Sequence, residues 1–152
     1  MGGFVILMNG SAVSWATKEQ SSIALSSTEA EYMAMTQATK EMRWLRVLLE
    51  EVGALNHIQQ MAGLYGDNQG ALALARNPEY HAQRKHIDIQ YHFVRELVQA
   101  EEVILEYCPS LDIIANIMTK ALPRPAHQKH TMAMGMISIT GKGYRTLRQG
   151  EC

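Results

Sequence analysis

Cysteine is scarce in this chain of 152 residues: its two thiols, Cys108 and Cys152, are too few for a disulfide framework or a cysteine-based zinc site. No apolar run approaches the roughly 20 residues that a membrane-spanning helix needs. The apolar run at 4–8 is too short for the core of a signal peptide, and no basic residue precedes it. The sequence therefore predicts an intracellular protein, in the cytoplasm or nucleus, that is neither secreted nor bound to a membrane.

A strong net charge is also lacking, since 14 basic and 15 acidic residues give a net charge of −1. A whole-protein field that would attract nucleic acid is therefore not expected. From residue 120 onward the charge is uneven, with one acid, Glu151, and the basic residues Lys120, Arg124, Lys129, Lys142, Arg145 and Arg148. Such a run is typical of a solvated tail or of a weak phosphate-binding arm. We expect one domain over 1–137 and a flexible basic tail over 138–152.

Local signals divide the chain into helices and strands. Asn9-Gly10 lies between two apolar-rich runs and favours a two-residue hairpin turn, because both positions need positive φ. Ser26 and Glu29 have the spacing of a capping box, and Gly53 is suited to end a helix. The expected elements are strands at 4–8 and 11–15, an extended stretch at 22–25, a helix at 27–52, a strand at 61–65, a helix through 71–75, a helix at 87–100, a strand at 103–108 and a helix at 111–122. This order predicts a mixed sheet flanked by helices, an α/β architecture.

Two acids lie where expected elements begin or end. Glu31 is near the start of the long helix, and Asp67 follows a strand, where open α/β sheets place their sites. Carboxylates from separate elements suit Mg²⁺, which prefers oxygen ligands. Each acid also has a structural interpretation, since Glu31 could complete a capping box with Thr28, and Asp67 could cap the next helix.

Four segments resemble the motifs of one family, in the family's order and spacing. They are 24–34 (family pattern ALSSTEAEYxA), 65–71 (YCDNQSA), 85–93 (KHIDIRYHF) and 112–123 (DxLADxxTKALP). These motifs resemble the ribonuclease H domain that ends copia-type retrotransposon Pol polyproteins, and the resemblance covers about 3–137. It implies a ribonuclease-H-like fold, with a five-stranded mixed sheet and flanking helices. It also implies hydrolysis of the RNA strand of an RNA–DNA hybrid with Mg²⁺ (or Mn²⁺), in company with the reverse transcriptase portion of the polyprotein.

The same resemblance assigns residues to an active site that the family builds from Asp, Glu, Asp and Asp. Glu31 matches the glutamate and Asp67 the second aspartate, so both are the implied catalytic and metal-binding residues. Ser27, Thr28 and Gln69 match positions that touch the hybrid. Lys85 is the remaining nucleic-acid-binding candidate, because it is placed to approach a phosphate backbone or simply to begin a surface helix.

The sequence departs from the family pattern in two places, and both departures affect the predicted metal-binding site. Position 116, where the family has its last aspartate, is Asn116, a neutral side chain that coordinates Mg²⁺ weakly. The strand that carries the first aspartate precedes the segment matched by Gly3-Phe4-Val5, so we expect an N-terminally truncated sheet without its central first strand. The site therefore has two negative ligands instead of four, and weak or absent metal binding is expected. Asp112, one turn before Asn116 in the expected helix, could partly substitute through a water.

The resulting expectation is a remnant of a ribonuclease H domain that is inactive or strongly impaired as this chain. One alternative is an active Mg²⁺-dependent ribonuclease H completed by a partner or a longer precursor. The other is a non-catalytic module that binds nucleic acid or another protein. For the two sheet edges left open by the missing strand, three outcomes are expected: they close on each other, another chain donates a strand, or the domain is loose and self-associates.

Overall fold

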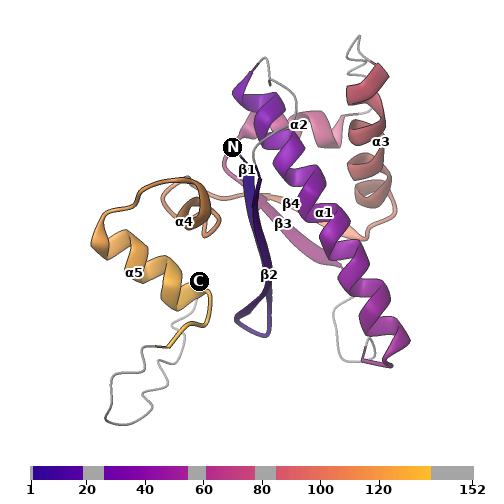
Figure 1. Ribbon diagram of the computed structural model, residues 1–152. Helices are drawn as coiled ribbons and strands as arrows, with labels where there is room; N and C mark the ends of the chain where they lie inside the picture. The colour runs from indigo at the N-terminus through magenta and orange to yellow at the C-terminus, as the bar shows by residue number, and fades with distance from the viewer. Residues whose placement is uncertain (1, 19–25, 55–60, 78–84, 138–152) are drawn as a thin grey trace.

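The computed structural model describes residues 2–18, 26–54, 61–77 and 85–137, and the side chains of all of these except 85–91 (Figure 1). The extended stretch expected at 22–25 and the basic tail expected at 138–152 lie outside the described residues. So does the side chain of Lys85. No helix in the described ranges is long and apolar enough to cross a membrane.

The chain begins with the predicted hairpin. Strands β1 (Gly2–Met8) and β2 (Ser11–Lys18) pair in antiparallel fashion. Asn9 and Gly10 both have positive φ, at 52° and 76°, as the two-residue turn requires. The hairpin is confirmed, and its strands extend beyond the predicted ends.

The long helix is also confirmed, as α1 (Ser27–Glu51). The Ser26 side chain accepts a hydrogen bond from the backbone N–H of Glu29 at 3.1 Å and so caps its start. Gly53 follows its end with φ of 72°, a conformation that glycine adopts without a steric penalty.

A parallel strand pair lies beside α1. β3 (Ala62–Gly66) and β4 (Val103–Tyr107) run in register from Ala62 opposite Val103 to Gly66 opposite Tyr107. Helices α2 (Gln69–Arg76) and α3 (Lys85–Gln99) form the crossover between them. Parallel strands need such a connection, and the observed order of strand, helix, helix and strand is the order of elements that the sequence predicts.

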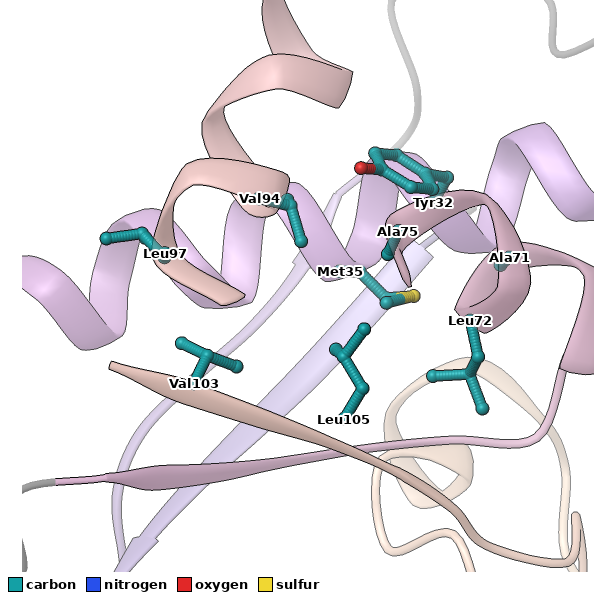
Figure 2. Close-up of a cluster of buried hydrophobic side chains, with 9 residues drawn as sticks. All are labelled: Tyr32, Met35, Ala71, Leu72, Ala75, Val94, Leu97, Val103 and Leu105. Carbon is teal, nitrogen blue, oxygen red and sulfur yellow. The ribbon is translucent and has the colours of Figure 1, made fainter. Parts of the chain in front are cut away.

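The hydrophobic core lies between this unit and α1. Figure 2 shows Val103 and Leu105 of β4 pointing toward the three helices, with Tyr32 and Met35 of α1 on the facing side. The remaining members come from α2 and α3: Ala71, Leu72, Ala75, Val94 and Leu97. The core therefore fixes the start of α1 against α2 and β4, close to the end of β3.

The described strands form two sheets of two strands, β1-β2 and β3-β4, where the sequence predicts one mixed sheet. The architecture is α/β, but the free edges of β1 and β3 do not close on each other. The hairpin and β3 contribute no fully buried residue. The buried strand residues of the core come from β4, and Leu64 of β3 packs against them while only partly buried. The two sheets are joined through α1, which packs on both β1 and β3.

The helix predicted at 111–122 is wrong. Only α4 (Asn116–Thr119) forms, after a series of turns in which Asp112 and Ile113 both donate to the carbonyl of Pro109. Pro109 and the side chain of Asn116, which bonds back to the carbonyl of Ser110, hold these turns in place of a regular helix. Asp112 is therefore not one helical turn before Asn116.

The sequence also missed α5 (Arg124–Ala133). Pro123 precedes this helix and Pro125 lies in its first turn, where a fixed φ and a missing N–H are tolerated. Proline also commonly follows the end of a helix, but here Pro123 and Pro125 mark the start of one. The backbone N–H of Ala12 donates to the carbonyl of Met134 at 2.9 Å, so the end of α5 is attached to the hairpin.

Candidate functional site

The two predicted acids lie near each other, one by the start of α1 and the other by the end of β3. Asp67 directly follows β3 and is half-buried, while Glu31 lies in the second turn of α1 and keeps access to solvent. Their carboxylates are close enough for the charge of Asp67 to act on Glu31. The sequence prediction that these two residues share a site is consistent with this geometry.

The pKa of Glu31 is raised above its ordinary value. Partial burial of the carboxyl is the largest cause, the negative charge of Asp67 adds to it, and the positive charge of Lys120 opposes both. Lys120 follows α4, so a third element reaches the site. No motif pointed to this role for Lys120, because it depends on how α4 packs against the start of β1.

That packing is close at Gly3. A side-chain carbon at this position would lie 2.8 Å from Cγ2 of Thr119 and 3.3 Å from Cβ of Met118. Thr17 on the neighbouring strand donates to the carbonyl of Met118 at 3.1 Å. The start of the hairpin therefore positions α4, and with it Lys120, beside Glu31.

Neither acid acts as the helix cap that the structural interpretations assigned to it. Asn68, not Asp67, caps α2, because its Oδ1 accepts from the backbone N–H of Ala71 at 3.0 Å. Ser26, not Thr28, caps α1. With the capping done by their neighbours, the carboxylates of Glu31 and Asp67 have no capping role.

Thr28 instead joins the two helix starts. Its hydroxyl donates to Oδ1 of Asn68 at 3.4 Å. Gly70 makes this approach possible, since a side-chain carbon there would lie 3.1 Å from both of those oxygens. Asn68 and Gly70 are thus site-building residues that the sequence patterns did not single out.

Asn116 is buried, with 8% of its surface exposed. Its side-chain amide donates to the carbonyl of Ser110, and Lys120 donates to the hydroxyl of the same serine at 3.5 Å. Asp112 is paired with Lys129 at the surface. Asn116 therefore anchors the turn at 110–116, and Asp112 is engaged away from Glu31.

The described residues contain no group of three or more His, Cys, Asp or Glu side chains arranged to hold a metal ion. Glu31 and Asp67 supply two carboxylates of the kind that Mg²⁺ accepts together with several waters. Burial, together with the charges of Asp112 and Asp67, raises the pKa of the Cys108 thiol, which disfavours the thiolate that a metal would need. Ser27 and Gln69 are exposed beside the two acids.

Comparison with known proteins identifies relatives over nearly the whole chain. It is 39% identical over 136 residues to the retrovirus-related Pol polyprotein from transposon TNT 1-94 of Nicotiana tabacum, a match covering 90% of this chain and 10% of the relative. It is 34% identical over 137 residues to the polyproteins from transposons RE2 and RE1 of Arabidopsis thaliana, covering 90% of this chain and 9% of each relative.

No family model matches the chain, and no solved structure matches it. The chain spans about a tenth of the length of the curated relatives that it matches. These relatives, which match over 90% of the chain, are Pol polyproteins of plant transposons.

Proposed function

We propose that this chain corresponds to a ribonuclease H portion of a retrotransposon Pol polyprotein, and that it cleaves RNA–DNA hybrids feebly or not at all by itself. The observation that carries the proposal is the meeting of Glu31 and Asp67 where α1 begins and β3 ends. The motifs around both residues and the polyprotein homology support the same assignment.

In this proposal Glu31 and Asp67 hold Mg²⁺ or Mn²⁺, which when bound activates water and stabilises the leaving oxygen of a phosphodiester. Ser27, Thr28 and Gln69 border the two acids and contact the hybrid through its minor groove and 2′-hydroxyls. Lys120 neutralises part of the negative charge of the pair. Lys85, at the first residue of α3, is the proposed phosphate contact.

Weak activity follows from the charge at the site. Asn116 brings no negative charge, and its amide is committed to the carbonyl of Ser110. Two carboxylates attract divalent ions less than four would, and the repulsion between two metal ions is compensated less. The expected metal affinity is therefore low.

A second candidate is an active nuclease completed by an added strand. Among the described strands, β1 and β3 each pair on one edge only, and neither contributes a buried residue. An extended segment of another chain or of the surrounding polyprotein could pair with such edges through backbone hydrogen bonds. A carboxylate carried on that segment would restore charge to the site.

Cleavage of a labelled RNA–DNA hybrid in Mg²⁺ or Mn²⁺ tests both candidates. The isolated chain should show little or no turnover, and any turnover should disappear in Glu31→Gln and Asp67→Asn but survive in Glu50→Gln, which alters an exposed acid at the other end of α1. Turnover that is insensitive to both site variants would overturn the assignment.

The same assay, repeated with the upstream polyprotein segment of a relative supplied in cis, tests the second candidate. Strong, Glu31-dependent turnover in that fusion alone would favour it. Salt-sensitive binding of the hybrid without turnover in either form would favour a nucleic-acid-binding module instead.

A further inference from the structure

In its C-terminal half, α1 carries an apolar face that the rest of the described chain leaves exposed. Trp44, Val47 and Leu48 are 58%, 47% and 40% exposed. The buried residues of this helix all lie nearer its start: Tyr32, Met35, Thr36, Ala38 and Thr39. Figure 1 shows the second half of α1 continuing away from α2, with no described helix drawn over it. The large side chains on this face therefore contribute little to the core, whereas Met42, also in this half of α1, packs against it.

These apolar residues form a regular pattern with two charges. Lys40, Trp44, Val47 and Glu51 are spaced by four, three and four residues, and all are exposed. This is the spacing of a seam along which one helix packs against another. We call these four residues, together with Leu48, the α1 stripe.

The charges of the α1 stripe make it complementary to itself. Lys40 and Glu51 lie at its two ends, equally far from the midpoint between Leu45 and Arg46, and Trp44 and Val47 are equally far from that midpoint on either side. In an antiparallel pair of α1 helices, Lys40 therefore faces Glu51 of the second copy, and Trp44 faces Val47. A parallel pair would instead place lysine against lysine and glutamate against glutamate.

A two-fold symmetric contact uses the same patch on both copies and so requires this kind of self-complementarity. We propose that the α1 stripe is the interface of a homodimer in which two α1 helices pack antiparallel. A single helix pair buries a small area, so the dimer dissociates on dilution. The proposal is independent of any nuclease activity.

Sedimentation velocity across a concentration series tests the dimer. The unmodified chain should shift from monomer to dimer as its concentration rises. Trp44→Gln should remain monomeric, whereas Leu111→Gln, which removes an apolar side chain that is 85% exposed outside the stripe, should dimerise like the unmodified chain. A chain that is monomeric throughout, or that forms open-ended aggregates, would overturn the proposal.

Charge-reversal variants distinguish this specific interface from non-specific hydrophobic association. Lys40→Glu and Glu51→Lys should each weaken the dimer by about tenfold, since two pairs change from attraction to repulsion. The double variant should recover most of the loss, and circular dichroism should confirm that every variant keeps its helix content. Failure of the double variant to recover would contradict the antiparallel pairing.

A zero-length carbodiimide cross-link gives an independent readout. Lys40 and Glu51 are separated by eleven residues of one helix, about 16 Å along its axis, which is too far for an amide bond within one chain. A cross-link between these two residues, found by mass spectrometry in the dimer band, is the expected result. Its absence from an otherwise well cross-linked dimer would place the interface elsewhere.

Discussion

Thr28 donates its hydroxyl to Oδ1 of Asn68 across 3.4 Å, and this contact joins the first turn of α1 to the cap of α2. The same Asn68 oxygen accepts from the backbone N–H of Ala71. Glu31 lies in the second turn of α1, and Asp67 directly precedes the cap of α2. The contact between Thr28 and Asn68 therefore ties together the two segments that carry the acids.

Replacing Asn68 should loosen this junction. Asn68→Ala removes the α2 cap and the acceptor for Thr28, and loss of a cap typically costs about 1–2 kcal/mol. Urea unfolding followed by circular dichroism measures the change. Asn68→Ser keeps a capping oxygen and should lose much less, and Thr28→Val, which leaves the cap intact, should fall between the unmodified chain and Asn68→Ala. Equal stability of Asn68→Ala and the unmodified chain would show that Asn68 does not cap α2.

The pKa of Glu31 predicts a pH-dependent effect of its replacement. Because burial and Asp67 raise this pKa in the folded state, folding holds the Glu31 proton more tightly than the unfolded chain does. Ionising Glu31 therefore costs stability as pH rises above the ordinary glutamate range, near about 4.3. Glu31→Gln should stabilise the chain at pH 7. The gain should be less than about 1 kcal/mol, because the carboxyl is only partly buried and solvent screens its charge, and it should vanish below about pH 4.

Thermal unfolding of Glu31→Gln and of the unmodified chain between pH 3 and pH 8 shows whether the replacement stabilises or destabilises the fold at each pH. Glu50→Gln, an exposed acid on the same helix, is the matched control and should show no such gain at neutral pH. Destabilisation by Glu31→Gln at pH 7 would mean that the Glu31 carboxylate is stabilised in the fold, contrary to the arrangement described.

Two glycines with the same backbone conformation should respond differently to substitution. Gly53 and Gly135 have φ of 72° and 75°, so alanine is strained at either, at a cost of about 1–2 kcal/mol. A side-chain carbon at Gly53 meets nothing within 4 Å, but at Gly135 it lies 2.5 Å from Oγ of Ser11 and 2.8 Å from the carbonyl oxygen of Gly10. Gly135→Ala should therefore be the more destabilising by about 1–3 kcal/mol, because the end of α5 must move away from the hairpin. Equal unfolding free energies for the two variants would show that α5 does not pack on the hairpin turn.

Local signals predicted the parts of the fold that local interactions determine. Asn9-Gly10, Ser26 and Gly53 each fix a turn or a helix end through their own backbone and side-chain chemistry, and all three did so as predicted. The helix predicted at 111–122 failed because apolar spacing alone cannot reveal that Asn116 bonds back to Ser110. α5 was missed because proline is typical both of the region after a helix and of a first turn, so Pro123 and Pro125 alone do not reveal that a helix begins there.

The candidate site also has a part that local sequence segments predict and a part that depends on tertiary packing. Glu31 and Asp67 could be predicted as site residues because each lies in a recognisable segment at the boundary of an element, and that assignment stays a prediction. Lys120 and the contact between Thr28 and Asn68 could not be predicted, since both depend on how α4 and α2 pack against the start of α1. Closure of the two open sheet edges on each other was one of the three expected outcomes, and it does not occur among the described strands, which no local pattern could reveal.

Asn116 offers the sharpest test of whether its position has become structural. Asn116→Asp replaces the amide that donates to the carbonyl of Ser110 with a carboxylate that can only repel it, at a site that is 8% exposed. Loss of a buried donor costs about 1–3 kcal/mol, so the variant should be destabilised at pH 7 and should gain no hybrid cleavage by itself. In acid the introduced carboxyl is protonated and can donate again, so the loss should shrink as pH falls.

Asn116→Ala distinguishes the effect of an introduced negative charge from the effect of losing the amide donor. It also leaves the Ser110 carbonyl without its amide partner, but it introduces no negative charge, so its destabilisation should not vary with pH through this position. Asn116→Asp should therefore be less stable than Asn116→Ala at pH 7, and the two should converge near pH 4. If Asn116→Asp keeps full stability and acquires Mg²⁺-dependent cleavage, the structural role of Asn116 is contradicted. That result would mean that the fold tolerates a carboxylate at this position and that the carboxylate binds the metal ion.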